Sequence, residues 1–591
     1  MSDSELDRRK FLRRSALLGA TAVGYDLLVT PAAAAWTQTA RSLQAPGDPQ
    51  EQDPQANELL VAASNSTSRR KASAAYVCDG IADEVEIVAA CNEAELVGGT
   101  VLLSEGTFHI DAPIQKAPSG FRFWNNLTIQ GQGRSTRIHN RQDIGGGDIY
   151  AIYVRGSGAT NLLSGVTLRD FVIYGDEYLT NTKGQHGVHV QFAKDFSFDN
   201  LWFETLSEEG LALDHTTFNV HGGRLYGYRL GSAVLDSAGT EHVSIDQIYA
   251  EEVCQVETDS ASVQIFEAEV AGRICKKWQI GRLHSVRSGA IGLKLDSCED
   301  VNVGQVIVDS QTSGSTKSRV GVLIDKSPNN AAPQNINLGQ VVIRNAGAHT
   351  PGRQASMHVL NAHYVNLQQL VIAGAYGHGL YLQNSTQCHF GQLIVHDPID
   401  TGQNPAPAAV CVDAASVDNT FNQIVVRGWV WGAANGQAVT LFGDRNLFGL
   451  LQVSGDAGVI GADSWDFIFN TGAADNILDT AIISGHGTGG IHNGGTGNQV
   501  GRVVKGTNGI NYKPYQNSGT ATVSAGATWV DVTHGLAFTP TARNIELVPT
   551  NNLGAAAKWW VSNLGATTFR INTDVDPGAG TAAFAWRAGP A

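Results

Sequence analysis

Short runs of alternating apolar and polar residues recur through most of the chain, between about Gly165 and Val504. One kind is a short run that usually starts at a small residue, as in Gly187-Val-His-Val, Gly210-Leu-Ala-Leu, Gly231-Ser-Ala-Val-Leu, Gly321-Val-Leu-Ile and Gly379-Leu-Tyr-Leu. The other kind is longer, as in Val301-Asn-Val-Gly-Gln-Val-Ile-Val, Ile336-Asn-Leu-Gly-Gln-Val-Val-Ile and Val365-Asn-Leu-Gln-Gln-Leu-Val-Ile. Successive starts lie roughly 20 to 35 residues apart, an interval that indicates a solenoid. Because each run has the two-residue period of a strand, the predicted solenoid is a β-helix.

One coil of such a solenoid cannot bury its Val, Ile and Leu side chains unless it stacks on its neighbours. Asn302, Asn337 and Asn366 recur at matching positions beside the strands. Equivalent side chains of adjacent coils are therefore expected to form a ladder, and we interpret these asparagines as structural.

The composition excludes several classes of protein. Of the 591 residues, 42% are hydrophobic and 16% are charged, which suits a large core and excludes general disorder. The balance of 40 Lys and Arg against 55 Asp and Glu gives a net charge of −15, which argues against nucleic acid as a partner. The seven cysteines are odd in number and lack a Cys-x-x-Cys pair. They are predicted to be buried small side chains, not disulfides or zinc ligands.

The first residues read as a targeting segment. Arg8-Arg9-Lys10-Phe11-Leu12 precedes an apolar stretch and the alanines 32–35, and this order resembles a twin-arginine export signal. The resemblance implies a signal peptide over residues 1–35 and a secreted, periplasmic or cell-surface protein, although Asp26 in the apolar stretch leaves an uncleaved anchor as the alternative. Residues 36–57 are predicted to be a linker, and no later stretch approaches the roughly 18 apolar residues of a membrane span.

The region after the linker carries a family resemblance. Glu84 to Leu96 has helical spacing with Asp83 as the predicted N-cap. Together with Asp79-Gly-Ile-Ala-Asp, Gly98-Gly-Thr-Val-Leu-Leu-Ser-Glu-Gly-Thr-Phe and Leu127-Thr-Ile-Gln-Gly-Gln-Gly, it resembles the N-terminal cap of the pectate-lyase-like superfamily. The resemblance implies an all-β, right-handed parallel β-helix over residues 58–510, closed by a helical cap.

The pattern changes over residues 516–591, where short strands alternate with Gly, Pro and Asn-rich turns. This spacing predicts a small antiparallel β-sandwich. Trp559, Trp560 and Trp586 are expected in its core, with a sugar-stacking platform as the alternative reading. A role of this domain in assembly is a further alternative.

The resemblance also directs attention to the turns before the short strands. In polygalacturonase-type members, acidic residues in these turns align in one groove, and the matching positions here are Gln185-His186, Glu208-Glu209 and Tyr228-Arg229. Ser207-Glu208-Glu209-Gly210 resembles the paired-aspartate turn of the family, which implies Glu208 and Glu209 as acid and base. The family's Asn-Thr-Asp motif would fall at Gly184-Gln185-His186, and its Gly-His-Gly motif would fall near Tyr228-Arg229. Both motifs are missing there, so polygalacturonase itself is not supported.

Coil spacing relates these residues to a third carboxylate, Asp259. Equivalent side chains lie about 5 Å apart in adjacent coils and about 10 Å apart across two coils. Glu208 or Glu209 with Asp259, two coils on, is therefore nearer the separation of about 6.5 to 9.5 Å of inverting glycosidases than the 5 to 5.5 Å of retaining ones. His186, Tyr228 and Arg229 are predicted substrate contacts.

A second acidic cluster leaves other chemistries open. Asp259, Glu267 and Glu269 frame a strand and compare with the mid-helix carboxylates of inulin fructotransferases, so Glu267 and Glu269 are also predicted substrate contacts. A polysaccharide lyase would need cations, often with calcium, and Lys276, Lys277 and Arg282 could supply the charge. No acidic set has the spacing of a calcium loop, so no metal or cofactor is expected, with calcium kept as the alternative.

The sequence thus predicts an exported enzyme that cleaves glycosidic bonds of an extracellular polysaccharide. A lyase or fructotransferase on the same fold is the second reading, and a non-enzymatic glycan-binding appendage is the third. Homotrimers are common in the superfamily, so the resemblance also implies a homotrimer.

Overall fold

The computed structural model describes residues 58–589 with internal gaps. The gaps are 97–98, 117–122, 144–147, 181, 257–259, 268–272, 310–319, 327–330, 346–354, 376, 397–407, 429–436, 455–464, 485–489, 506–516 and 537–538. The predicted signal and linker lie outside the described residues. The described chain falls into two compact units, which meet in sequence between Val234 and Leu235.

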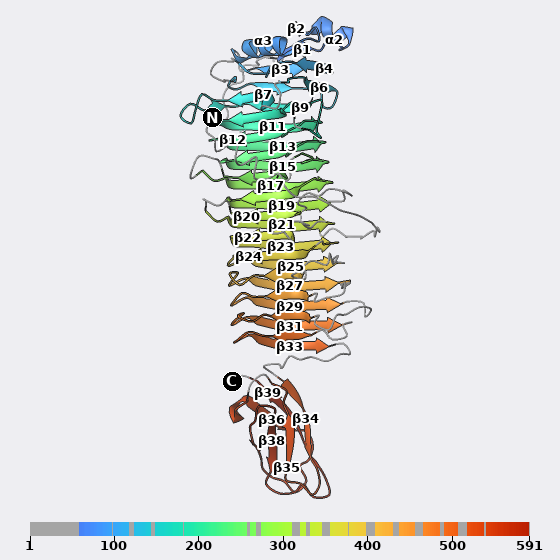
Figure 1. Ribbon diagram of the computed structural model, residues 1–591, viewed down its shortest axis with the longest axis vertical. Coiled ribbons are helices and arrows are strands. Elements are labelled where there is room, and N and C mark those ends of the chain that lie inside the picture. The colour runs from blue at the N-terminus through green and yellow to red at the C-terminus, as the bar shows by residue number, and fades with distance from the viewer. Residues whose placement is uncertain are drawn as a thin grey trace, which may run out of the picture. The chain divides into compact units, whose positions relative to one another are not determined.

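The first unit contains short helices and parallel strands stacked in successive coils (Figure 1). Its helices are α2 (Ser68–Ser73) and α3 (Glu84–Glu95). The strands of its larger sheet are β1 (Glu58–Ala62), β2 (Tyr76–Val77), β3 (Thr100–Leu103), β4 (Gly106–Ile110), β5 (Thr128–Gln130), β6 (Thr136–Asn140), β8 (Leu163–Ser164), β9 (Thr167–Tyr174), β11 (Ala193–Glu204) and β13 (Phe218–Tyr228). Those of its smaller sheet are β7 (Ile149–Arg155), β10 (Gln185–Gln191) and β12 (Leu211–Asp214).

The second unit repeats the arrangement. One sheet contains β15 (Glu241–Glu251), β17 (Lys276–Val286), β19 (Glu299–Asp309), β21 (Gln334–Arg344), β23 (His363–Ala373), β25 (His389–His396), β27 (Thr420–Arg427), β29 (Leu447–Ser454), β31 (Ile477–Ser484) and β33 (Gln499–Lys505). The other contains β14 (Leu235–Ala238), β16 (Ala261–Phe266), β18 (Ile291–Asp296), β20 (Val322–Asp325), β22 (Ala355–Leu360), β24 (His378–Gln383), β26 (Ala408–Val412), β28 (Gln437–Leu441), β30 (Trp465–Phe469) and β32 (Ile491–Asn493). The predicted right-handed parallel β-helix is confirmed, with the hand that connections between parallel strands almost always take.

Helix α3 lies on the first strands, where a cap was predicted. The buried residues Ile87, Ala90, Cys91 and Ala94 lie on the side of the helix that packs against β1 and β3. Asp83 is the N-cap residue, as predicted, but its side chain makes no helix-cap hydrogen bond. Its carboxylate instead accepts from the backbone N–H groups of Gly80 (2.8 Å) and His109 (2.7 Å), so Asp83 ties the start of the helix to β4.

The amide side chains form ladders, but the main ladders are not the predicted one. Asn366 donates to Asn337 at 3.4 Å on the surface. A buried ladder in the turns of the second unit is more extensive, and its members are Asn419, Asn446, Asn476 and Asn498. A further ladder of glutamines follows the outside of the strands, through Gln305, Gln340, Gln369, Gln392 and Gln423.

The C-terminal residues form two antiparallel sheets, as predicted. The first contains β34 (Asn517–Val523), β39 (Ala582–Ala588) and β36 (Ile545–Pro549), and the second contains β35 (Trp529–Thr533), β38 (Thr568–Thr573) and β37 (Trp559–Ser562). A short 3₁₀ helix, η1 (Ala542–Asn544), precedes β36. Both sheets contribute to one core that contains Trp586, which is 6% exposed. The prediction that Trp559 and Trp560 belong to this core is wrong, since they are 40% and 49% exposed.

All seven cysteines are buried and none forms a disulfide, which confirms their reading as small apolar side chains. Neither helix in the described part of the chain has the length and apolar character needed to cross a membrane.

The buried asparagine ladder provides a first test of what stabilises the coils. The Asn446 carboxamide accepts from the backbone and side-chain nitrogens of Asn419 and donates to Ser416 and Asn476. Asn446→Ala should leave several of these buried groups without a partner and destabilise the protein by about 2 to 5 kcal/mol. Chemical denaturation monitored by circular dichroism measures the change. The surface variant Asn366→Ala should change stability by less than about 0.5 kcal/mol, and equal losses in the two variants would contradict the structural role of the buried ladder.

Candidate functional site

The candidate site lies in the first unit, on β7, β10 and the turn before β12. The parallel register pairs His186 with Tyr150 and His189 with Tyr153. Val188 and Val190 are buried in the core, so His189 and Gln191 face the opposite side of the sheet. A side chain at Gly187 would meet the core ring of Phe203 at 2.4 Å, so only glycine fits at this corner. The preceding residue, His186, points away from the core.

His186 and Glu209 form a close pair between adjacent coils. Nδ1 of His186 lies 2.5 Å from Oε2 of Glu209, and its Nε2 lies 3.7 Å from Oδ1 of Asp148. Ser232 donates to the other oxygen of Glu209 at 3.2 Å. Backbone hydrogen bonds fix the two turns, because Glu208 N donates to Gln185 O at 3.1 Å and Gly187 N donates to Glu209 O at 2.9 Å.

The two partners set each other's protonation. Burial alone would lower the pKa of His186, but the neighbouring Glu209 and Asp148 carboxylates reverse this effect and raise it well above its ordinary value. Burial alone would raise the pKa of Glu209, but the imidazolium of His186 reverses that effect and lowers it. At neutral pH the pair is therefore an imidazolium and a carboxylate.

Glu208 brings a second carboxylate to the same place. His186, Glu208 and Glu209 each offer one atom that could bind a metal ion, a ring nitrogen or a carboxylate oxygen, and these three atoms all lie within 4.8 Å of one another. Such a set could hold a divalent cation only if His186 lost its proton, since metal ligands must be deprotonated. The raised pKa of His186 opposes that state, so a cation at this cluster would have to displace the proton of His186.

Aromatic and polar side chains extend this cluster along the same side of the sheet. The ring of Tyr150 lies 4.7 Å from that of His186 and 4.3 Å from that of His189. Tyr153 stacks on His189 at 5.1 Å, and His189 Nε2 lies 2.7 Å from Oδ2 of Asp214. Arg155 donates to the Tyr153 hydroxyl at 3.1 Å. Burial raises the pKa of Tyr150, which keeps its phenol protonated.

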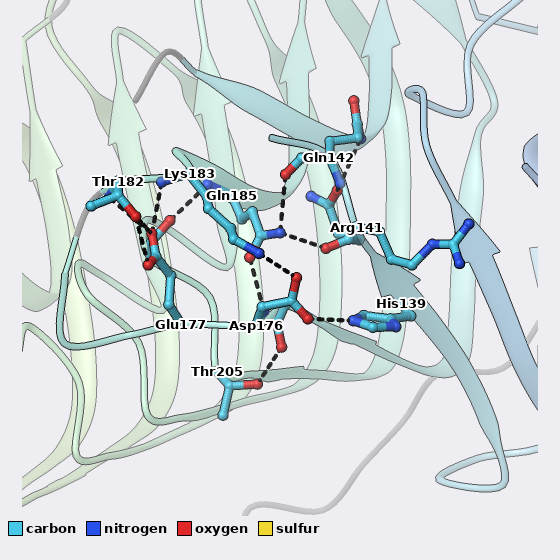
Figure 2. Close-up of polar contacts among 12 residues, drawn as sticks. His139, Arg141, Gln142, Asp176, Glu177, Thr182, Lys183, Gln185 and Thr205 are labelled. Carbon is cyan, nitrogen blue, oxygen red and sulfur yellow. Dashed lines mark hydrogen bonds and ion pairs between the residues drawn. The ribbon is translucent and has the colours of Figure 1, made fainter. Parts of the chain in front are cut away.

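A hydrogen-bonded turn positions the strand that carries His186 (Figure 2). Asp176 pairs with Lys183 at 2.8 Å and with His139 at 2.7 Å, while Glu177 accepts from the backbone N–H groups of Thr182 and Lys183. Gln185 joins this turn to the preceding coil. Its Oε1 accepts from Asp176 N at 2.9 Å, and its Nε2 donates to the carbonyls of Asn140 and Gln142.

The structure brings together some of the predicted site residues. His186, Glu208 and Glu209 form the cluster described above. Tyr228 and Arg229 stack on each other, with the guanidinium carbon 4.8 Å from the ring centre, and Arg229 also lies 5.7 Å from the ring of Tyr178. Glu267 is buried and belongs to the second unit. Asp259 and Glu269 lie outside the described residues.

Four further residues adjoin the cluster that no sequence pattern had singled out, namely Tyr150, Tyr153, His189 and Asp214. The signal was present in the alternation of Ile149–Arg155, but this strand lacks the initial glycine that marked the others. Placing Tyr150 beside His186 required the register of β7 on β10.

Comparisons with known proteins identify no family. No family model and no curated protein matches the chain. Similar solved structures include the tailspike protein gp49 from Pseudomonas phage LKA1, with 12% identity, 85% of this chain and 92% of that chain covered, and a TM-score of 0.39. The Azotobacter vinelandii mannuronan C-5 epimerase AlgE6 A-module has 14% identity, 66% and 94% coverage and a TM-score of 0.31. PfbA, a surface adhesin of Streptococcus pneumoniae, has 10% identity, 72% and 90% coverage and a TM-score of 0.30. Similarity at this level assigns no substrate to the chain.

The buried pair predicts a characteristic dependence of stability on pH. The raised pKa of His186 stabilises the fold fully below its ordinary value of 6.5, and this contribution is lost as the pH rises through the folded-state pKa. The lowered pKa of Glu209 stabilises the fold above 4.5, and this contribution is lost as the pH falls. The wild type should melt at a higher temperature than the variant His186→Gln/Glu209→Gln. The difference between the two melting temperatures should be largest between pH 4.5 and 6.5 and should decrease on both sides of this range.

Differential scanning calorimetry across the pH range measures this profile. The control Asp418→Asn/Arg445→Gln removes an exposed pair with a 2.7 Å contact. The control should give a smaller difference that falls only on the acidic side, because solvent screens the pair and Arg445 stays charged. A flat profile for the His186 and Glu209 variant would contradict the assigned charges.

Proposed function

We propose that the chain is a carbohydrate-active enzyme that hydrolyses glycosidic bonds of an extracellular polysaccharide. The observation that carries this proposal is the cluster of Glu208, Glu209 and His186, whose ligand atoms lie within 4.8 Å of one another. Most glycoside hydrolases use a pair of carboxylates. The aromatic rings of Tyr150 and Tyr153 beside the cluster offer stacking surfaces for the C–H faces of sugars.

The environments of the two glutamates suggest different roles for them. The His186 imidazolium holds Glu209 ionised, which suits a nucleophile or base. Glu208, the second carboxylate of the cluster, is assigned the role of the general acid that protonates the leaving oxygen. Asp259, the partner expected from coil spacing, is not needed in this scheme.

The charge around the pair favours hydrolysis over elimination. With Glu208 serving as the acid, the carboxylates of Asp148, Glu209 and Asp214 still outnumber the cations of His186 and Arg155 that lie beside them. An elimination reaction needs positive charge to neutralise the uronate carboxylate, and this acidic surface would repel it. A neutral polysaccharide is therefore the preferred substrate class. Export through the twin-arginine route and assembly as a homotrimer remain part of the proposal.

The separation of the two glutamates predicts the stereochemistry of the reaction. Retaining glycosidases hold their carboxyl groups about 5 to 5.5 Å apart, whereas inverting ones leave about 6.5 to 9.5 Å for a water molecule. Carboxylate oxygens of Glu208 and Glu209 lie within 4.8 Å of each other, which is closer to the retaining range. The first-formed sugar should therefore keep the anomeric configuration of the substrate, and proton NMR of the anomeric signals early in the reaction can detect this. The opposite anomer would contradict a Glu208 and Glu209 pair and would require a more distant second carboxylate.

Substitution at the pair tests the proposal directly. Glu208→Gln and His186→Gln/Glu209→Gln should each lower hydrolysis by at least about 100-fold, since each removes an acid–base group. Reducing ends released from a panel of polysaccharides measure the rate, and circular dichroism checks the fold. Glu105→Gln, at an exposed ion pair of the same unit, serves as the control and should retain wild-type activity.

Two outcomes would contradict the proposal. Products that absorb in the ultraviolet as unsaturated uronates would indicate a lyase. Binding of polysaccharide without any new reducing ends would indicate a glycan-binding appendage protein.

A further inference from the structure

The C-terminal sandwich exposes two tryptophans in one row of its second sheet. Trp529 on β35 and Trp560 on β37 both lie directly opposite Asn572 on the central strand β38. Residues directly opposite each other share one face of a sheet, so both indoles and Asn572 point to the same side. The core residues Val532, Phe569 and Ile571 alternate with them and face the other sheet.

The two rings are unusually accessible for tryptophan. Trp529 is 46% exposed and Trp560 is 49% exposed, whereas Trp586 is 6% exposed in the core. Tryptophan is highly buried on average, and its exposure in pairs marks a contact surface. We call this face the tryptophan face and define it by Trp529, Asp531, Trp560, Arg570 and Asn572.

The polar members of the tryptophan face hold it in a fixed shape. Arg570 bonds both oxygens of Asp531, at 2.7 and 2.9 Å, and its guanidinium carbon lies 3.6 Å from the ring centre of Trp529. The ring of Trp529 is thereby oriented before any ligand arrives, which reduces the entropy lost on binding. Asn572 donates to Ser562 Oγ at 2.8 Å and to Trp560 O at 3.3 Å, and places a carboxamide between the two indoles.

We propose that the tryptophan face binds an uncharged oligosaccharide or polysaccharide chain. Trp529 and Trp560 lie on the two strands that flank β38. Two strand spacings therefore separate them, an interval of about 10 Å, which two linked pyranose rings span. Apolar ring faces flanking amide, hydroxyl and carboxylate groups match a sugar, which has C–H surfaces above and below and hydroxyls around its edge.

Charge and composition argue against other occupants. The cation of Arg570 is matched by Asp531, so the face has no surplus positive charge to attract phosphate groups or anionic lipid. A stable dimer buries about 800 Å² on each partner with an apolar centre, whereas the centre of the tryptophan face is the polar Asn572. A neutral glycan is the partner that this combination fits.

Affinity electrophoresis of the full chain tests the proposal without relying on catalysis. Native gels that contain laminarin, hydroxyethyl cellulose or galactomannan should retard the wild type in at least one case. The His186→Gln/Glu209→Gln protein should be retarded equally, so failure of the proposed hydrolysis and failure of this binding site are distinguishable. Trp529→Ala and Trp560→Ala should each weaken binding by roughly tenfold or more, as expected when a tryptophan at the centre of a contact is truncated.

Two matched variants separate binding from folding. Trp560→Phe keeps an aromatic ring and should restore most of the retardation. Trp559→Ala removes the neighbouring indole, which lies opposite Thr573 and therefore on the other side of the strand, and should leave retardation unchanged. Thermal unfolding of each variant checks that the sandwich is intact.

The proposal is overturned by any of three results. These are no retardation of the wild type in any of the gels, full retardation of folded Trp560→Ala protein, or equal loss in folded Trp559→Ala protein. A change of oligomeric state in Trp560→Ala, measured by sedimentation, would assign the face to contacts between copies instead.

Discussion

The stacking of parallel coils is the constraint on which the rest of the structure depends. Each side chain lies about 4.8 Å from its equivalent in the next coil, so the identity of one residue limits what its neighbour can be. Amides tolerate self-stacking because each can donate to the next, as in the ladder from Gln305 to Gln423. Like charges gain no such bond from stacking. Some charged residues instead pair with an opposite charge one coil away, as Lys276 does with Glu299.

The candidate site follows the same rule with a different consequence. His186 and Glu209 are a pair between adjacent coils, as are His189 and Asp214. An exposed pair such as Asp418 and Arg445 contributes little to stability, because solvent screens the attraction between its charges. The His186 and Glu209 pair is buried, where desolvation opposes the attraction and apolar residues of similar volume are often more stabilising. Stability is therefore a weak reason for this pair, and its control of protonation is a stronger one.

The sequence allowed prediction of those features that depend on local periodicity. Alternating runs and initial glycines were sufficient for the β-helix, because Gly187 and Gly210 both pack against Phe203. The pattern also placed Glu208, Glu209 and His186 at neighbouring corners. It could not assign their charges, since burial and partner distance determine the pKa of each group. Tyr150 and the asparagines from Asn419 to Asn498 were missed because their alignment depends on register across coils whose lengths vary.

The same limit explains the tryptophans of the sandwich. Adjacent residues of a strand point to opposite sides, so Trp559 and Trp560 could not both face one core, whatever the composition of the domain. Trp586 occupies that core, and its ring lies 5.4 Å from Phe569 on the facing sheet. The pairing of Trp529 and Trp560 through Asn572 is a property of the three-stranded sheet, not of any one segment. Such rows become visible only when the strand order is known, and they are where a sequence that looks like core can instead form a binding surface.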